Sequence, residues 1–281
     1  MLRQRLITAV LLLAVFLPAV FAVDPVYFVL STLVLMGAAA WEWGRLSGQS
    51  HFQSLAGAAM MALAGLGLWN IELNPAGLLW IWRVAALVWL VLAFFALHKG
   101  AAYWGKLPPA LRFWCGWAML LVSWLAMVQS RVVGINFLLS VMCLVWVSDV
   151  CAYFAGRAWG NRWIARKLAV SISPGKTWEG VAGALLGVGV VAFAWRYADS
   201  QNPGNSQSIF SRAVQDWGDL GALALGLLVA AGVVGDLLES LFKRAAGVKD
   251  SSRLLPGHGG VLDRVDALLP VLPLAMCLAA Q

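Results

Sequence analysis

The chain has 281 residues, of which 62% are hydrophobic and only 12% are charged, and its mean hydropathy is +0.81. Soluble proteins carry about 45–50% apolar and about 25% charged residues, so this composition excludes a soluble globular protein. It also excludes intrinsic disorder, which requires low hydrophobicity and high charge. The chain is therefore expected to fold within a lipid bilayer.

Apolar segments recur along the whole chain, and a helix needs roughly 20 such residues to cross a bilayer. The segments are 6–23, 26–43, 52–70, 76–98, 112–129, 132–152, 178–199, 217–240 and 261–280. We predict an all-α polytopic integral membrane protein with about nine transmembrane helices. Because the spans use most of the residues, we expect a single transmembrane domain over 1–281.

The twenty Lys and Arg residues follow this topology. When the chain is threaded alternately through the segments, all but four lie on one side. Arg131, Arg196 and Arg212 lie on the other side, and Arg83 lies within the fourth segment. Since basic loops face the cytoplasm, we predict a cytoplasmic N-terminus and a C-terminus on the opposite side of the membrane. The net charge of +7 is thus explained by the membrane and does not indicate nucleic-acid binding. The first segment also resembles a cleavable signal peptide, an alternative that leaves eight spans.

The polar residues divide the chain into two parts. Residues 1–148 carry few of them, such as Glu42 and Asn136, and are predicted to be mainly scaffold helices. Residues 149–281 carry three polar clusters, all on the predicted cytoplasmic side, and are predicted to be the catalytic half. Within this half, Gly183 and Gly187 lie four residues apart, which predicts close contact with another helix.

The first cluster contains Asp149 and Tyr153, four residues apart and so on one helical face. A carboxylate near the end of an apolar helix costs a few kcal/mol unless it is paired or faces a cavity. The two side chains are expected to line the same cavity. The alternative is a structural partner for an arginine.

The second cluster is the stretch from Ser171 to Gly180. Ser173 followed by Pro174 predicts a helix start, in which Ser173 caps the free amides and Pro174 takes the first helical position. The positive end of this helix and the charge of Lys176 together favour an anion such as phosphate. A phosphate-binding P-loop is excluded because Val stands at 170, where that motif needs Gly. The alternative is an ordinary capped helix.

The third cluster, residues 235–266, is rich in carboxylates. Asp236, Glu239, Ser240 and Lys243 share one helical stripe, and after a glycine-rich turn Asp263 and Asp266 share a face of the next helix. Such carboxylates repel one another unless a cation intervenes, and oxygen ligands favour Mg²⁺. The alternative is a charged loop neutralised by salt bridges.

Basic residues lie beside these carboxylates: Lys243, Arg244, Lys249, Arg253 and Arg264. Carboxylates that hold a metal next to basic side chains are the recurring arrangement for phosphoryl and nucleotidyl transfer. His258 lies between glycines on a turn with unusual backbone freedom, which favours close approach to a ligand.

The run from Ser240 to Asp266 resembles a family signature, with the pattern Ser-x-Phe-Lys-Arg-x4-Lys-Asp-x-Ser-x2-Leu-Pro-x-His-Gly-Gly-Val-x-Asp-Arg-Val-Asp. This is similar to the phosphatidate cytidylyltransferases, or CDP-diglyceride synthases, of the bacterial type. The resemblance extends to the Asp149–Tyr153 segment, to the Ser173–Gly180 stretch and to Trp41-Glu42-Trp43.

The resemblance implies transfer of CMP from CTP to phosphatidic acid, which gives CDP-diacylglycerol and pyrophosphate in phospholipid biosynthesis. It also implies a Mg²⁺ requirement, with a second metal ion left open, and a homodimer among membrane lipids. The bacterial type implies the inner membrane, with a periplasmic C-terminus and an active site at the cytoplasmic face. The catalytic residues expected are Asp236, Asp263, Lys243, Arg244, Lys249, His258 and Arg264. The substrate-binding residues expected are Asp149, Tyr153, Ser173, Lys176, Thr177, Glu179, Ser240, Asp250, Gly259 and Gly260. The metal ligands expected are Asp236, Asp263, Asp266 and Glu239.

Other functions are distinguished by simple observations. An ion-coupled transporter also carries carboxylates in membrane helices, but here no duplicated half is apparent and the polar residues gather at one face. A CDP-alcohol phosphotransferase carries an Asp-Gly-x2-Ala-Arg element, which is absent. A CTP-dependent lipid kinase differs in its product, since it releases CDP in place of pyrophosphate.

Overall fold

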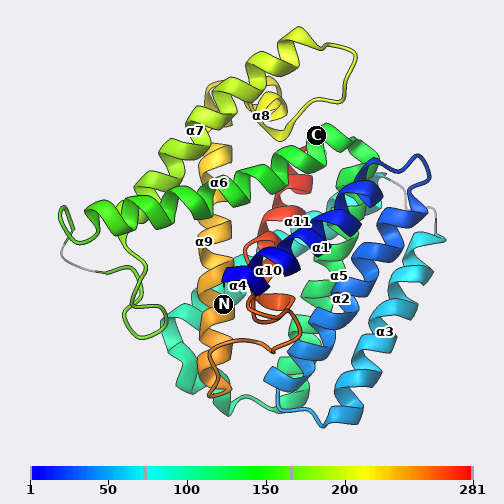
Figure 1. The fold of residues 1–281 in the computed structure, drawn as a ribbon, viewed down its shortest axis with the longest axis vertical. Helices are drawn as coiled ribbons and strands as arrows, with labels where there is room; N and C mark the ends of the chain where they lie inside the picture. Colours follow the sequence, from blue (N-terminus) through cyan, green and yellow to red (C-terminus); the bar gives the residue numbers. More distant parts are fainter. Residues whose placement is uncertain (1, 72–74, 165–166, 280–281) are drawn as a thin grey trace.

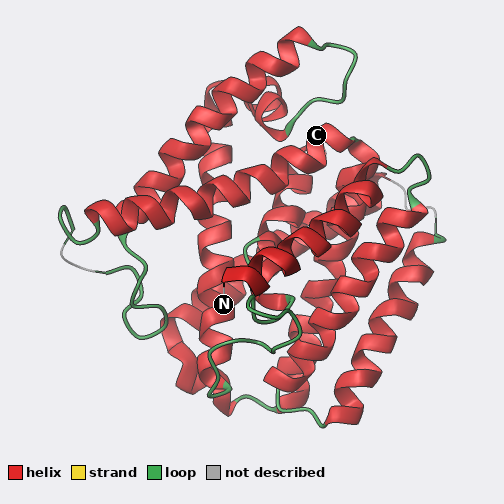
Figure 2. Ribbon diagram, viewed as in Figure 1, coloured by secondary structure: helices red, strands yellow, loops and turns green. Residues whose placement is uncertain are grey.

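The computed structural model describes residues 2–71, 75–164 and 167–279, and this part of the chain is almost entirely helical (Figures 1 and 2). The helices are α1 (Leu2–Phe21), α2 (Val26–Leu46), α3 (His51–Trp69), α4 (Pro75–Lys106), α5 (Pro109–Val133), α6 (Ile135–Trp159), α7 (Trp178–Gln201), α8 (Ile209–Trp217), α9 (Gly221–Ala245), α10 (Leu262–Val265) and α11 (Leu268–Ala279). A short 3₁₀ turn, η1 (Gly218–Leu220), joins α8 to α9. The all-α prediction is confirmed.

Seven described helical segments are long and apolar enough to cross a bilayer: Val26–Leu46, His51–Trp69, Gly77–Lys106, Pro109–Val133, Ile135–Trp159, Trp178–Gln201 and Ile209–Ala245. Large apolar side chains such as Leu186 and Phe193 of α7 point outward, as expected where lipid is the solvent. The total of nine spans and the orientation of the termini stay predictions.

The ninth predicted span, 261–280, differs from the structure, although residue 280 lies outside the described residues. The segment is divided into α10, of 4 residues, and α11, of 12 residues. A helix of 12 residues is about 18 Å long, which is shorter than the hydrocarbon core of about 30 Å. Pro270 favours a helix restart at Leu268, because proline fits the first turn of a helix and its ring crowds the carbonyl of Asp266, four residues earlier; α11 accommodates a second proline, Pro273, further along.

Two other predicted boundaries shift. The sixth segment was expected to end at 152, but α6 continues to Trp159, so Asp149 and Tyr153 lie well inside a helix. The fourth segment was expected to end at 98, but α4 continues to Lys106. Its helix is interrupted at Gly100, which has a φ of 79°.

The core lies where α2, α5, α9 and α11 meet (Figure 1). Phe28, Trp124, Leu228 and Val271 are completely buried there, one from each of these four helices. Helices of the predicted scaffold half therefore pack directly against helices of the predicted catalytic half.

The α6–α7 pair extends to one side of this core (Figure 1). A Cβ added at Gly183 or at Gly187 would overlap Ala155 or Cys151 of α6. The predicted close helix contact is confirmed, because only glycine lets the two backbones approach this far.

The polar loops gather at one end of the molecule. The α2–α3 connection, the α4–α5 connection and the loop that follows α9 lie together there (Figure 1). The chain from 246 to 261 returns from this end to α10, close to the start of α1, where the Thr8 hydroxyl donates to the Pro256 carbonyl at 3.0 Å. This arrangement places the third sequence cluster beside the first two.

Candidate active site

A cavity of about 810 Å³ opens between α6, the start of α7, α9 and the α10 region. Most of the predicted site residues line it, although they come from four separate stretches of the chain. These are Asp149, Tyr153, Lys176, Thr177, Asp236, Ser240, Lys243, Arg244, Lys249, Asp250, Asp263, Arg264 and Asp266. The fold thus brings the three sequence clusters to one place.

Two lysines form ion pairs with two of the aspartates that line this cavity. The Lys176 Nζ lies 2.6 Å from the Asp236 carboxylate, which joins the loop before α7 to α9. The Lys243 Nζ lies 2.5 Å from the Asp263 carboxylate and also contacts Glu239, one turn earlier on α9. Asp236 and Asp263 therefore each have a lysine partner that the phosphates of a nucleotide could attract away.

Asp263 is held by the main chain as well as by lysine. Its carboxylate accepts from the amides of Ser251 and Gly260, at 3.0 and 2.8 Å, and from the Ser251 hydroxyl at 2.8 Å. Burial by itself would raise the pKa of Asp263, but these hydrogen bonds and Lys243 outweigh it and lower the pKa to about 2. Asp263 is thus ionised and fixed in orientation.

Asp266 has the opposite electrostatic environment. Burial, and then the negative charges of Asp236 and Asp149, raise its pKa to about 7. Asp149, Asp236 and Asp266 therefore lie close enough to repel one another. A cation bound between them would relieve this repulsion.

The cavity wall meets the chemical requirement for Mg²⁺, which prefers oxygen ligands. Among the described residues, no group of three His, Cys, Asp or Glu side chains is already gathered around one point for a metal ion. The reason is the pairing of Asp236 and Asp263 with lysines. Their carboxylate oxygens are the donors that a metal would use after the lysines turn away.

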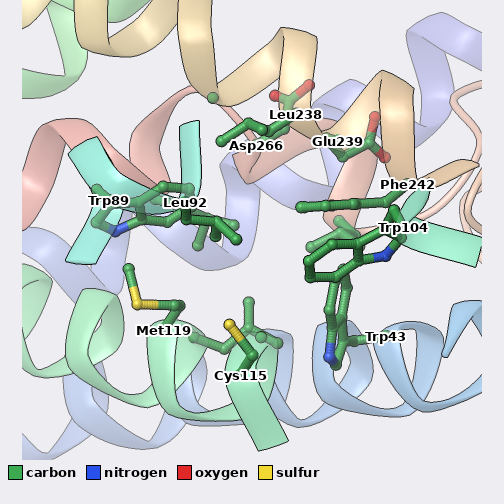
Figure 3. Close-up of a pocket in the computed structure, with 15 residues that line it drawn as sticks. Trp43, Trp89, Leu92, Trp104, Cys115, Met119, Leu238, Glu239, Phe242 and Asp266 are labelled. Atoms are coloured by element: carbon green, nitrogen blue, oxygen red, sulfur yellow. The ribbon is translucent and has the colours of Figure 1, made fainter. Parts of the chain in front are cut away.

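Glu239 faces away from this cavity. At 100° per residue it lies about 60° around the helix from Asp236, and it lines a smaller apolar cavity with Trp43, Trp104 and Phe242 (Figure 3). Its side chain is buried and contacts Lys243. In this arrangement Glu239 holds Lys243 and is not placed among the cavity carboxylates.

Comparison with known proteins agrees with this arrangement of carboxylates and basic side chains. Residues 3–280 match the family described as the Cytidylyltransferase family. The chain belongs to this family.

Several curated relatives are named phosphatidate cytidylyltransferase. One from Pseudomonas aeruginosa is 37% identical over 279 residues, which cover 97% of this chain and 95% of the relative. One from Haemophilus influenzae is 34% identical over 300 residues, which cover 97% of this chain and 96% of the relative. One from Brucella suis is 36% identical over 279 residues, which cover 95% of this chain and 89% of the relative. The similarity therefore extends over nearly the whole length of each protein.

The start of α7 corrects one expectation. Ser173 does not cap this helix, which begins four residues later than predicted. Thr177 is the N-cap, and its hydroxyl accepts from the Gly180 amide at 3.1 Å. Ser173 instead accepts from the Lys176 amide at 3.2 Å through its carbonyl, in a turn that Pro174 and Gly175 form. The Ser-Pro pair marks a turn here, and Thr177, not Ser173, reaches the cavity.

Four other expected residues lie behind the cavity wall. Glu179 accepts from the amides of Trp163 and Ile164, both at 3.0 Å, and so holds the α6–α7 connection. Gly259 has a φ of 85°, and together with Gly260 it shapes the turn that presents Asp263. His258 lies in the same turn, and its Nδ1 is buried without a hydrogen-bond partner among the described residues.

The sequence reasoning missed the role of Glu42. This residue was assigned to the scaffold half, but its carboxylate is completely buried against the 246–262 segment. An ionisable residue in an apolar helix is by itself a signal of function or pairing. The signal was present in Trp41-Glu42-Trp43, and only the fold shows what Glu42 contacts.

Proposed function

We propose that this protein transfers the cytidylyl group of CTP to phosphatidate, which gives CDP-diacylglycerol and pyrophosphate. The observation that carries the proposal is the 810 Å³ cavity, in which aspartates and basic side chains meet beside membrane-spanning helices. Relatives of the same length that carry the name phosphatidate cytidylyltransferase support this choice of substrates.

The reaction requires little covalent chemistry from the protein. A phosphate oxygen of the lipid attacks the α-phosphorus of CTP, the α–β phosphoanhydride bond breaks, and pyrophosphate leaves with the electron pair. The lipid phosphate is already anionic near neutral pH, so no general base is needed. Positioning and charge stabilisation then provide most of the rate enhancement.

The basic residues of the cavity would carry out this stabilisation. Arg244, Lys249 and Arg264 are exposed at its wall and are free to meet the phosphates of CTP and of the lipid. Lys176 and Lys243 would exchange their carboxylate partners for phosphate oxygens when the nucleotide enters. Asp236 and Asp263 would then be available to bind a metal ion.

Asp236, Asp263 and Asp266 would hold Mg²⁺. The metal, when bound, supplies positive charge to the triphosphate oxygens and to the departing pyrophosphate. After burial, the negative charges of Asp236 and Asp149 also raise the pKa of Asp266, and this repulsion supports a cation at this wall. Glu239 is less suitable as a ligand because it does not line this cavity and its carboxylate contacts Lys243.

We also propose that the cavity opens at the cytoplasmic face of a bacterial inner membrane and that the protein is a homodimer. The distribution of Lys and Arg along the chain supports the sidedness. The position also suits the substrates, because CTP is water-soluble and phosphatidate lies in the leaflet.

The test is incorporation of CTP labelled at the α-phosphate into phosphatidate vesicles by the purified full-length protein, with pyrophosphate measured in parallel. Asp236→Asn and Asp263→Asn should abolish turnover while the variants stay folded in detergent, because each substitution removes charge and little volume. Release of CDP would instead indicate a lipid kinase. Absence of any labelled lipid from the wild-type protein would refute the proposal.

A further inference from the structure

Glu42 is a completely buried carboxylate at the C-terminal part of α2, far in sequence from the cavity. Its oxygens accept from the hydroxyls of Ser251 and Ser252 and from the amides of Val261 and Leu262, at 3.1, 2.5, 3.0 and 2.7 Å. A buried carboxylate is stable only when donors surround it in this way. All four donors come from one segment, residues 246–262, which we call the anchored loop.

The anchored loop carries residues of the cavity. Lys249 and Asp250 line the cavity wall, and the loop ends where α10 presents Asp263. Apart from short turns, this segment has no regular secondary structure between Ala245 and Leu262. Its position therefore depends on tertiary contacts, and Glu42 holds it at two places, Ser251–Ser252 and Val261–Leu262.

Glu42 and Asp263 share the donors of this loop. Of three consecutive amides, Gly260 donates to Asp263, and Val261 and Leu262 donate to Glu42. The Ser251 hydroxyl lies between the two carboxylates, 3.1 Å from Glu42 and 2.8 Å from Asp263. A hydroxyl has one proton, so Ser251 can donate to only one of the two carboxylates at a time. The Ser251 hydroxyl thus links Glu42 to Asp263.

Gly260 leaves no spare space in this arrangement. A Cβ at this position would overlap the Ser251 hydroxyl and the Glu42 carboxylate. The two carboxylates, the serine and the loop backbone are therefore packed as one unit, and a change at Glu42 is transmitted directly to the group that orients Asp263.

We propose that Glu42 is a positioning residue for the cavity: its carboxylate on α2 holds the anchored loop so that Lys249 and Asp263 face the substrates. The expected effect of Glu42 on turnover rests on the proposed function, whereas its expected effect on the position of the loop does not. It gives the first half of the chain a direct role in the site.

The test compares Glu42→Gln with Thr32→Val in the full-length protein. Glutamine has the same size as glutamate but a single acceptor oxygen, and its NH₂ group would face the donors of the loop. Thr32 is a matched control because it is also completely buried in α2, where its hydroxyl donates to the Phe28 carbonyl and accepts from the Trp124 indole, away from the loop.

We expect Glu42→Gln to speed hydrogen exchange at the amides of residues 248–262 and to lower kcat by at least about 10-fold, the loss typical of a residue that supports a ligand-holding group. Thr32→Val should lower thermal stability without either effect. Two results would overturn the inference. One is faster hydrogen exchange spread evenly over α2 with unchanged kcat, and the other is a loss of kcat with unchanged hydrogen exchange in the loop.

A second variant covers the case in which Glu42→Gln does not fold. Ser252→Ala removes one donor to Glu42 and leaves the helices intact, so it should speed exchange in the same loop and lower kcat by a smaller factor. Wild-type behaviour of Ser252→Ala in both measurements would overturn the inference. If the wild-type protein incorporated no CTP, the proposed function would fail, whereas the exchange comparison would still test the role of Glu42.

Discussion

Gly235 offers a quantitative test of how the cavity is assembled. A Cβ at this position of α9 would lie 2.6 Å from the carbonyl oxygen of Asp266 and 2.8 Å from the ring of Pro270. These atoms belong to the backbone and to a rigid ring, so they cannot rotate away. Gly235→Ala should therefore push α9 away from the turn that precedes α11.

Gly232, one turn earlier on α9, is the matched control. A Cβ there would meet its nearest atom, in Val271, at 3.6 Å, which is ordinary contact. Both substitutions gain about 1 kcal/mol in helix propensity, so this term cancels between them. The remaining difference is overpacking, which costs about 1–3 kcal/mol. Gly235→Ala should be less stable than Gly232→Ala by this amount.

Turnover should fall along with stability. Asp236 follows Gly235 directly, and a displacement of about 1 Å in a reacting arrangement can cost about 100-fold in rate. The assays are thermal unfolding in detergent and labelled CTP incorporation for both variants. Equal stability and equal turnover of the two variants would refute the claim that this close approach sets the cavity.

Three further substitutions probe the site. Lys249→Ala should mainly raise the KM for CTP or phosphatidate with little loss of stability, because this lysine is exposed at the cavity wall; unchanged kinetics would exclude a phosphate contact. Lys243→Met should destabilise the protein by about 3–5 kcal/mol, because it leaves Glu239 and Asp263 buried without their cation. Thermal unfolding in detergent would measure this loss of stability. Thr177→Val should cost about 1 kcal/mol through loss of the α7 N-cap, and a melting temperature equal to wild type would contradict that role.

The positions of the helices in the middle of the chain could be predicted well from the sequence. Each apolar run between 26 and 240 became part of a long helix, because a bilayer requires every backbone group to be satisfied within its own segment. The ends of the runs were less certain. Thr177 and Ser173 are both good caps, and only the turn at Pro174–Gly175 decides between them. Pro270 likewise divides the last run into two short helices.

The composition of the site was also present in the sequence. The spacing of Asp236, Ser240 and Lys243 defines one face of a helix, and all three line the cavity. Glu239 shares that stripe in sequence but lies at its edge, so the neighbouring aromatic side chains of α2 and α4 determine where it points.

Taken alone, the sequence determined that this protein spans a membrane through many helices and that its polar groups gather in residues 149–281, because hydropathy and helical spacing are local properties. Only the tertiary structure decided which carboxylate pairs with which lysine, and that Glu42 supports the loop beside Asp263. These contacts join residues up to 220 positions apart. Their geometry depends on how helices pack, which no local pattern encodes.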